Sequence, residues 1–450
     1  MEVLIEEFSS SLDTFSIYTL FREKNSIFLD SALRENNLGD YSFIGVNPFL
    51  TFKSYDNNVW INGELSIEEP FNALEKLMNK YKITNDNSIP FLSGAIGYFS
   101  YDMGRTLEKL PTTAKEDVKI PHSYFVFYDN IIIFDHKNNK NYVTALGVKE
   151  PKKQSICNIL QRIKEGKQVV YEEIINKTEK CLKSNFSKNS YLGAVETFRE
   201  YIRSGDIYIS NLTQRFSCNC NKPSYEIYKD LRIINKAPFA AFMELEGFEV
   251  ISSSPERFMK IYNRKVETRP IKGTRPRGKD KLEDEKNKIE LINSEKDKSE
   301  LLMIVDLERN DLSKVCKNNS VKVTELFVIE KYATVFHLVS TIEGTLRDDV
   351  SSIECIKQCY PGGSITGAPK IRAMEVIEEV EELRRNIYTG AIGYFDYRGN
   401  SDFNIVIRTI LKEDDTAYFG VGGGITFESN KEDEYEETLH KAKALIKVLQ

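Results

Sequence analysis

The sequence of 450 residues contains no run of about 18 consecutive apolar residues, so no membrane-spanning helix is expected. It also has no basic excess, because 62 Lys and Arg face 68 Asp and Glu and leave a formal net charge of −6. Proteins that follow nucleic-acid phosphates usually have a basic balance or a basic stripe, so no nucleic-acid partner is expected. The first residues, MEVLIEEFSS, lack the positive charge and apolar stretch of a signal peptide. These absences predict a cytoplasmic protein.

The chain also lacks the regular alternation of strands and helices that indicates a doubly wound parallel sheet. Runs rich in β-branched and aromatic residues predict strands at 14–20, 26–33 and 41–54, and helical spacing predicts a helix over 67–81. A hairpin is expected over 124–148, with its turn at KNNKN. These patterns favour an α+β fold.

The sequence predicts three segments: an N-terminal lobe at 1–148, a lysine-rich helical connection at 149–189, and a segment at 190–450 that carries the motifs described below. The string GAIGYF occurs at 94–99 and again at 390–395. This repeat predicts a structurally equivalent strand in each of two lobes. Cysteines are few and irregularly spaced, which predicts free thiols rather than disulfides.

Acidic side chains gather on two stretches with helical spacing. Glu434, Glu437 and Lys441 stand at positions i, i+3 and i+7 near the C-terminus, so they share one helix face. Asp297 and Glu300 stand at i and i+3 in a second, continuous helical stretch. Two such faces that meet would suit Mg²⁺, which takes one or two carboxylates together with water and substrate oxygens. Taken alone, these spacings are more often found on solvated helix faces.

Glycine, proline and basic residues punctuate the second half of the chain. The stretch 269–279 is expected to be a loop, either simply solvated or forming a pocket for a small anion. Glycine-rich stretches follow at 361–370, 388–393 and 420–425, where backbone N–H groups can approach an anion closely. The first does not match a phosphate-binding P-loop, because Lys370 does not directly follow a glycine and no Ser or Thr comes after it. A bound nucleotide is therefore not expected.

These segments together resemble the family of chorismate-using enzymes, which includes anthranilate, aminodeoxychorismate, isochorismate and salicylate synthases. N-terminal strings such as YSFIGVNP and SGAIGYFSYD extend the resemblance to the whole chain. The matching strings of the second half occur in family order and are GDIYISNLTQRF (205–216), SSSPERF (252–258), RPIKGTRPRG (269–278), DLERNDLSKVC (306–316), FHLVSTIEG (336–344), PGGSITGAPK (361–370), YTGAIGYF (388–395), GVGGGI (420–425) and EYEETLHKAKAL (434–445).

The resemblance implies one α+β unit with two large packed β-sheets, helices outside and an active-site cleft toward one side. It also implies Mg²⁺ as the cofactor, held by Glu300 and Glu437, with Asp297 and Glu434 as outer neighbours and the ring carboxylate of chorismate as a ligand. His337 has a simpler alternative, a satisfied core histidine. The other implied substrate contacts are Lys441, Gly422, Gly423 and Gly424 at the ring carboxylate, Arg408 and Tyr388 at the enolpyruvyl carboxylate, Gly273 and Thr274 beside the ring, and Thr366 and His337 in the pocket wall.

Two positions separate the activities within this family. Lys272 stands in PIKGT where anthranilate synthases usually have alanine, which resembles the aminodeoxychorismate synthases. The water-activating lysine of isochorismate and salicylate synthases aligns with Ile209, which cannot act as a base; many aminating relatives have glutamine there, so Ile209 departs from their pattern too. The resemblance implies that Lys272 attacks C2 of chorismate while the C4 hydroxyl leaves, with Glu256 as general acid and base. Ammonia then attacks C4 and expels the lysine.

The sequence contains no ammonia source of its own. None of its seven cysteines lies in the G-x-C-x-G turn of a glutamine amidotransferase, so a separate amidotransferase subunit is expected. Chorismate and ammonia would be the substrates, and the product would lead to 4-aminobenzoate and folate. Two alternatives stay open: the activity of anthranilate synthase component I, and a non-catalytic chorismate-binding protein, which would need neither Lys272 nor Glu256.

Three short pieces resemble parts of the tryptophan pocket of anthranilate synthases. They are residues 29–31, 41–42 and 238–240. Asp30 stands where glutamate is usual, and Asp40 stands where arginine often precedes the YSFIG run. Whether this chain binds tryptophan stays open.

Overall fold

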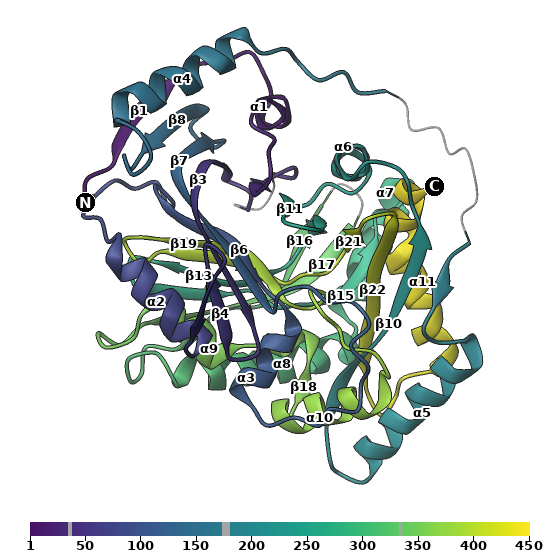
Figure 1. Ribbon diagram of the computed structural model, residues 1–450. Helices are drawn as coiled ribbons and strands as arrows, with labels where there is room; N and C mark the ends of the chain where they lie inside the picture. The colour runs from purple at the N-terminus through teal and green to yellow at the C-terminus, as the bar shows by residue number, and fades with distance from the viewer. Residues whose placement is uncertain (35–37, 173–180, 333–334) are drawn as a thin grey trace.

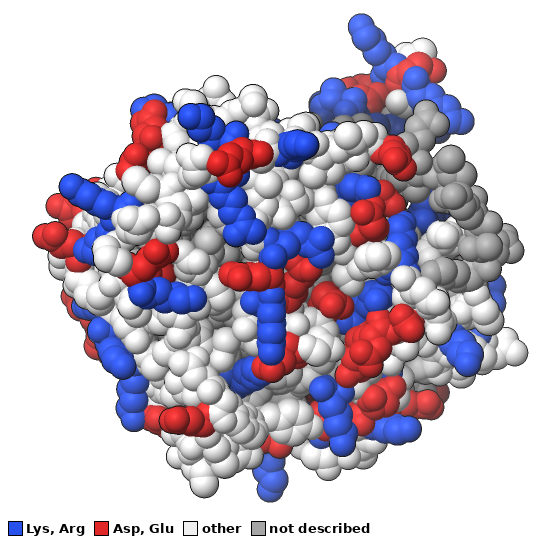
Figure 2. Space-filling view, turned by 45° about the horizontal axis from the view of Figure 1, so that its top comes forward, with Lys and Arg blue, Asp and Glu red and all other residues white. Residues whose placement is uncertain are grey.

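The structure, a computed structural model, describes residues 1–34, 38–172, 181–332 and 335–450 (Figure 1). Antiparallel strands form two large sheets with helices on their outer sides, which confirms the expected α+β class. No helix of the described residues is both long and apolar enough to cross a membrane. On the face seen in Figure 2, basic and acidic side chains are mixed over most of the surface.

Two long strands, β3 (Tyr41–Tyr55) and β7 (Ser123–Asp135), pair along almost their whole length and belong to both sheets. Their register shifts between Pro48 and Leu50, and such an irregularity bends a strand pair. The first half of β3 and the second half of β7 continue into the first sheet, and the other halves continue into the second.

The two sheets are antiparallel throughout the described residues. The first sheet contains, in order, β1 (Leu4–Phe8), β8 (Lys140–Ala145), β7, β3, β2 (Ser26–Asp30), β11 (Phe239–Glu244), β12 (Glu249–Ser254), β21 (Thr409–Glu413), β22 (Thr416–Ile425) and β10 (Ile209–Asn219), with β9 (Lys183–Ser184) and β18 (Gly367–Ala368) along β10. The second contains, in order, β5 (Glu64–Ile67), β4 (Asn58–Ile61), β3, β7, β6 (Gly94–Phe99), β19 (Ala391–Asp396), β20 (Ser401–Asn404), β13 (Arg257–Tyr262), β14 (Lys265–Thr268), β17 (Val335–Thr345) and β16 (Lys322–Lys331). Strand β15 (Ile271–Pro276) follows β14 end to end and pairs with the other half of β17.

The first sheet is apolar on both faces, because successive side chains of a strand point to opposite sides. On β11, Phe242 packs into a cluster beneath the covering helices, whereas Ala241 and Met243 face the main core with the second sheet. On β12, Ile251 and Val250 divide in the same way. Each of the larger of these buried side chains contributes roughly 1.5–3 kcal/mol of hydrophobic stabilisation.

The helices divide according to the surface that they cover. Those on the first sheet are α1 (Thr14–Leu20), α4 (Lys152–Glu165), α6 (Ser224–Ile234) and α11 (Lys431–Leu449), and α5 (Lys188–Arg203) and α10 (Lys370–Val380) pack beside β10. Those on or beside the second sheet are α2 (Pro70–Lys80), α3 (Gly104–Leu107), α7 (Lys281–Ile292), α8 (Glu295–Ser313) and α9 (Ser352–Cys359), with the short 3₁₀ turns η1 (Tyr101–Met103) and η2 (Gly363–Ile365).

Three local expectations are corrected. Residues 14–20, expected as a strand, form α1, because Asp13 caps the helix by accepting from Ser16 N and the helix buries its apolar side chains under the first sheet. The continuous helix expected around Asp297 is broken into α7 and α8, since the Ser294 side chain accepts from Asp297 N and starts a new helix. The loop expected at 269–279 contains strand β15, which pairs with β17.

The repeated string GAIGYF forms two strands that are neighbours rather than members of separate lobes. β6 and β19 pair antiparallel, and Gly97 stands opposite its counterpart Gly393. A Cβ atom on Gly97 would lie 2.0 Å from the carbonyl oxygen of Tyr124, and one on Gly393 would lie 2.0 Å from that of Asp402. Glycine is therefore required in both copies by the close approach of the flanking strands. The two copies join the N-terminal segment to the C-terminal one within the second sheet.

Candidate functional site

A cavity of about 780 Å³ lies where the end of the first sheet meets the edge of the second. Its walls come from β22 and β10 of the first sheet, β15 and β17 of the second, and the helices α8 and α11. Most of the residues expected at a site line this one cavity: Glu256, Lys272, Gly273, Thr274, Asp297, Glu300, His337, Tyr388, Arg408, Gly422, Gly424, Glu434, Glu437 and Lys441.

Two expected residues do not line the cavity. The Thr366 hydroxyl is buried and donates to the carbonyl of Gly362 at 2.9 Å, so it stabilises the turn η2 instead of facing a ligand. Gly423 is turned toward α11, where a Cβ atom would lie 3.3 Å from Glu434 Oε2 and 3.5 Å from Glu437 Oε1. Thr366 is therefore a correction to the expected pocket wall, whereas Gly423 lies beside the carboxylates of α11 that line the cavity.

Lys272 reaches the cavity because strand β15 is irregular beside it. Gly273 has φ of +78°, a conformation that favours glycine, and the pairing with β17 shifts register between Lys272 and Thr274. Lys272 Nζ donates to the carbonyl of Ser364 at 3.4 Å. A Cβ atom on Gly424 would lie 3.3 Å from Lys272 Nζ and 3.4 Å from Ile209 Cδ1, so the lysine, the glycine and the isoleucine meet at one point.

Glu256 lies at the inner end of the cavity. It follows strand β12, and only 7% of its surface is exposed. Burial raises the pKa of the Glu256 carboxyl, and the Ser364 hydrogen bond and the positive charges of Lys272 and Lys441 offset part of that rise. Ser364, which sequence reasoning missed, thus contacts both Lys272 and Glu256. A carboxyl group with a raised pKa beside a lysine can donate a proton to a leaving group.

The acidic side chains of α8 and α11 face each other across the mouth of the cavity. Between them lies Lys296, whose Nζ is 3.9 Å from Glu300 Oε1 and 3.6 Å from Glu434 Oε1. Lys441 Nζ is 2.5 Å from Glu437 Oε1. Burial raises the pKa of Glu300 and of Glu434, while for Glu437 burial is outweighed by Lys441, which lowers the pKa of this carboxyl.

The arrangement of these carboxylates bears on metal binding. In the part of the chain that the structure describes, no three Asp, Glu, His or Cys side chains come close enough to share an ion. Asp297 pairs with Arg275 at 3.2 Å, and Glu434 accepts from the Ser429 hydroxyl at 2.7 Å. Glu300 and Glu437 also line the cavity, and their nearest printed partners are the ammonium groups of Lys296 and Lys441. A pair of carboxylates is the donor set that Mg²⁺ uses, so the residues present fit this ion.

Polar side chains on the opposite wall are also held in place. Thr274 Oγ1 lies 2.9 Å from His337 Nδ1. Burial and the Arg408 charge lower the pKa of His337 to about 4, so the ring is neutral at physiological pH. Arg408 has φ of +53°, rare for a residue with a side chain, and its guanidinium donates to the carbonyl of Lys441. Tyr388 lies beside it, and a Cβ atom on Gly420 would lie 2.3 Å from its ring.

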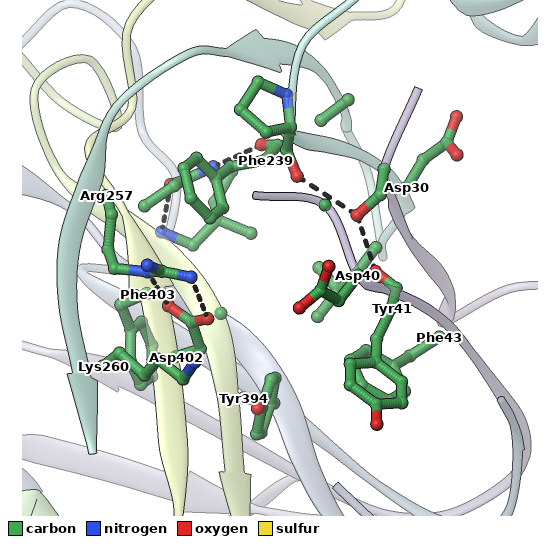
Figure 3. Close-up of a pocket in the computed structure, with 18 of the residues that line it drawn as sticks. Asp30, Asp40, Tyr41, Phe43, Phe239, Arg257, Lys260, Tyr394, Asp402 and Phe403 are labelled. Atoms are coloured by element: carbon green, nitrogen blue, oxygen red, sulfur yellow. Dashed lines mark hydrogen bonds and ion pairs between the residues drawn. The ribbon is translucent and has the colours of Figure 1, made fainter. Parts of the chain in front are cut away.

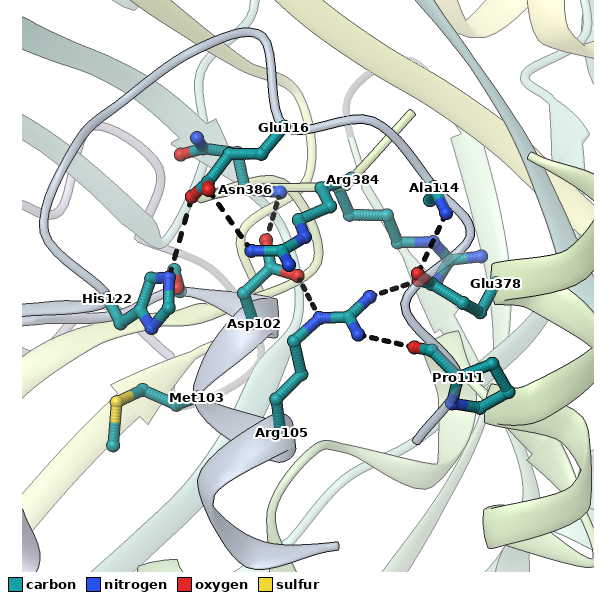
Figure 4. Close-up of polar contacts among 12 residues, drawn as sticks. Asp102, Met103, Arg105, Pro111, Ala114, Glu116, His122, Glu378, Arg384 and Asn386 are labelled. Atoms are coloured by element: carbon teal, nitrogen blue, oxygen red, sulfur yellow. Dashed lines mark hydrogen bonds and ion pairs between the residues drawn. The ribbon is translucent and has the colours of Figure 1, made fainter. Parts of the chain in front are cut away.

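The segment that carries Tyr388 is fixed by the N-terminal part of the chain (Figure 4). Asn386 N donates to Asp102 Oδ2 at 2.9 Å, and its side-chain amide donates to the carbonyl of Val118 at 2.8 Å. Arg105 pairs with both Asp102 and Glu378. The wall around Tyr388 therefore depends on contacts that are distant in the sequence, such as the one between Asn386 and Asp102, which are 284 positions apart.

The chorismate-binding enzyme family matches residues 24–447, almost the whole chain. The chain belongs to this family. Relatives at similar identity are Anthranilate synthase component 1 of Acetivibrio thermocellus, 36% identical and covering 100% of this chain and 95% of its own length, and Aminodeoxychorismate synthase component 1 of Bacillus subtilis, 37% identical and covering 95% and 92%.

Solved structures of similar proteins agree with the assignment of this chain to the family of chorismate-binding enzymes. Anthranilate synthase component I from Streptococcus pneumoniae has a TM-score of 0.82 at 30% identity and covers 90% of this chain and 92% of its own. The menaquinone-specific isochorismate synthase from Escherichia coli has a TM-score of 0.75 over 100% of this chain and 94% of its own, but at 16% identity it supports the fold alone. The expected two-sheet architecture is thus confirmed.

A second, smaller pocket of about 110 Å³ is lined by residues 29–43 of this chorismate-binding enzyme together with residues from its second half (Figure 3). Its wall includes most of the pieces that resemble a tryptophan pocket, together with Asp40 and Asp402. Asp30 accepts from Arg232 Nε at 2.9 Å, and Arg257 Nε donates to Asp402 Oδ1 at 3.0 Å. Asp30 and Asp402 are therefore each paired with an arginine of the protein itself.

Proposed function

We propose that the chain is component I of an aminodeoxychorismate synthase, which converts chorismate and ammonia to 4-amino-4-deoxychorismate for the synthesis of 4-aminobenzoate and folate. The observation that carries this proposal is the amine of Lys272 inside the cavity, 3.4 Å from the Ser364 carbonyl and next to Gly424, with the buried Glu256 carboxyl sharing Ser364. A nucleophile and a proton donor therefore face the same space.

The reaction that these two residues support has two displacements. The Lys272 amine, in its neutral form, bonds to C2 of chorismate, the ring double bond shifts, and the C4 hydroxyl leaves as water after taking the proton of Glu256. Ammonia then bonds to C4, the double bond shifts back, and the C2–N bond to Lys272 breaks. Ile209, beside Lys272, offers no base that would activate water at C2.

Chorismate is a dicarboxylate, and the charges around the cavity suit both of its ends. Arg408 and Tyr388 lie where a guanidinium and a phenol can hold the enolpyruvyl carboxylate. Lys441 and Gly422 also line the cavity and would bind the ring carboxylate. Glu300 and Glu437 would hold Mg²⁺, which supplies positive charge for the ring carboxylate when it is bound.

The nitrogen would come from a separate glutamine amidotransferase subunit. The names of the relatives, each a component 1, support this expectation. We propose that the isolated chain uses ammonium salts but not glutamine, because its cysteines lack the setting of an amidotransferase nucleophile.

The test is to incubate the pure chain with chorismate, Mg²⁺ and ammonium and to analyse the product by mass spectrometry. The expected product is non-aromatic and retains the enolpyruvyl group. The competing function is anthranilate synthase component I, favoured by the match to the A. thermocellus relative over 100% of the chain. Release of pyruvate together with an aromatic 2-aminobenzoate would overturn the proposal in favour of this alternative.

A further inference from the structure

Beneath the cavity lies a buried carboxyl group that the proposed reaction does not use. Glu308 stands on α8, and its Oε2 is 2.9 Å from the hydroxyl oxygen of Thr268. Its stem packs against the turn before Ser364, since a Cβ atom on Gly363 would lie 3.6 Å from Glu308 Cγ. In the sequence, Glu308 looks like one more charge in an acidic helix, so only the fold reveals that it is buried.

The hydrogen bonds of Thr268 bear on the protonation of Glu308. A hydroxyl group has one proton to donate. Thr268 Oγ1 lies 2.8 Å from the carbonyl oxygen of Phe258, an acceptor only. When Thr268 donates to Phe258, its contact with Glu308 is satisfied only if the Glu308 carboxyl carries a proton and donates. The geometry therefore suits a neutral carboxylic acid.

The charged groups around Glu308 also favour the neutral form. Glu256 faces it from the end of β12, and Asp311 lies on its own helix. The positive charge of Lys370, on α10, also acts on Glu308. The Nζ of Lys370, however, donates to Asp311 at 2.5 Å and to the carbonyls of Cys359 and Pro361. Burial, with the negative charges of Glu256 and Asp311, raises the pKa of Glu308 to about 8.

We propose that Glu308 is a positioning residue that must be protonated for turnover, and that its ionisation sets an alkaline limit on the activity. This inference rests on the proposed roles of Lys272 and Glu256. Glu308 contacts the side chain of Thr268, which precedes Lys272 on the way into β15, and packs near Gly363, which precedes Ser364. Through the Thr268 hydroxyl it is also linked to the carbonyl of Phe258, which follows Glu256.

Ionisation would disturb this arrangement in two ways. The carboxylate cannot donate, so Thr268 would turn its proton toward Glu308 and leave the buried carbonyl of Phe258 without that donor. The new negative charge would also face Glu256 and hold the proton of Glu256 more tightly. Glu256 would then fail to act as the base when ammonia is added. Both effects lower the rate without removing any group that touches chorismate.

The test compares the pH–rate profiles of the wild type, Glu308→Gln and Asp306→Asn, with the consumption of chorismate in ammonium as the assay. Glutamine keeps the size and the donor but cannot ionise. We expect the wild-type rate to fall about tenfold per pH unit above the pKa of Glu308, and Glu308→Gln to keep its neutral-pH rate and move this limb upward by about one pH unit or more. Asp306, exposed on the same helix, is the matched control, and its replacement should leave the profile unchanged.

Infrared difference spectra between neutral and mildly alkaline buffer give a second readout. A protonated-carboxyl band should disappear in the wild type and be missing from the difference spectrum of Glu308→Gln. An unshifted alkaline limb in Glu308→Gln, or an equal loss of rate at every pH, would overturn the inference. If Glu308→Gln does not fold, the wild type decides: an alkaline limb with no accompanying loss of the carboxyl band overturns it. An aromatic product with the pH shift intact would overturn the proposed function and leave the role of Glu308 standing.

Discussion

The large cavity and the second pocket both contain ion pairs, but in the large cavity Lys272 and Glu256 stand without an ion pair among the described residues. In the second pocket, Arg257 is bound by two carboxylates, and Asp30 is bound by Arg232. In the large cavity, Lys272 Nζ donates to the carbonyl of Ser364 at 3.4 Å, and burial raises the pKa of Glu256. Charged side chains that have no ion-pair partner in the wall of their own pocket are available to interact with a substrate. This contrast supports the proposal that the chemistry occurs in the large cavity, and it favours a role in stability or ligand binding for the second pocket.

The largest effect is expected for Lys272→Ala. The variant should lose the formation of the C4-amino product by on the order of 10³-fold or more, because the covalent route is removed. Without ammonia, the wild type should accumulate an adduct on the 269–278 segment, detected by intact mass and peptide mapping. Lys260→Ala, in the wall of the second pocket, is the matched control and should turn over normally. A wild-type rate in Lys272→Ala would show that ammonia reaches C4 directly, and the contrast between the two spaces would fail.

Glu256→Gln is expected to have the next largest effect. Glutamine keeps the size of the side chain but carries no transferable proton, so the rate should fall roughly 10²–10⁴-fold. Single-turnover measurements should locate this loss in adduct formation at Lys272, because the C4 hydroxyl leaves in that step. Fast adduct formation in Glu256→Gln would assign the proton to another group.

The acidic wall gives a smaller and more specific prediction. Glu300→Gln and Glu437→Gln should each weaken Mg²⁺ binding by at least about 10–100-fold, as measured by calorimetry. Turnover should fall at limiting Mg²⁺ and recover in part at high Mg²⁺. The control is Glu432→Gln, because Glu432 is an exposed carboxylate in the first turn of α11, the helix that carries Glu437. Normal turnover by either cavity variant in limiting Mg²⁺ would exclude these residues as ligands.

In the second pocket the expected effect is on stability rather than on rate. Asp30 is only 2% exposed, and its removal leaves the Arg232 guanidinium buried without its carboxylate. Asp30→Ala should lower the free energy of unfolding by about 3–5 kcal/mol in urea titrations, while each folded molecule keeps its rate with ammonium. A large loss of rate at unchanged stability would show that the second pocket takes part in the chemistry.

The sequence predicted which residues gather at the cavity better than it predicted how the chain reaches it. The spacing of Glu434, Glu437 and Lys441 places them on one helix face in any context, so the helix α11 and its acidic side followed directly. The pairing of β6 with β19 is long-range, and no local periodicity encodes it. The helix α1 was also not predictable from its local sequence. Its aromatic and β-branched residues favour a strand, but the cap at Asp13 and the packing of the helix on the first sheet override that preference.

Residues whose role depends on burial were the least predictable. Lys296 and Glu308 lie on α8, where the sequence shows only a mixture of charges, and nothing local separates the buried positions from the solvated ones. Ser364 is one polar residue in a glycine-rich turn, and its contact with Lys272 arises from the meeting of η2 and β15. Thr366 was misplaced for the same reason, since a hydroxyl can turn to the backbone as well as to a ligand.

The smallest expected effect concerns the ligand of the second pocket. Arg257 is already paired with Asp402 and Glu267, and the Asp40 carboxylate lies in the wall of the pocket (Figure 3). A tryptophan carboxylate would therefore meet negative charge, and we expect tryptophan to bind weakly. Asp40→Arg replaces that repulsion by attraction, and about 1 kcal/mol at such a partly exposed site corresponds to roughly fivefold tighter binding of tryptophan. Indole, which has no carboxylate, should bind the two proteins equally in calorimetric titrations. An equal gain for indole would mean that the substitution reshapes the pocket, and tight binding of tryptophan to the wild type would show that Asp40 does not repel the carboxylate of the ligand.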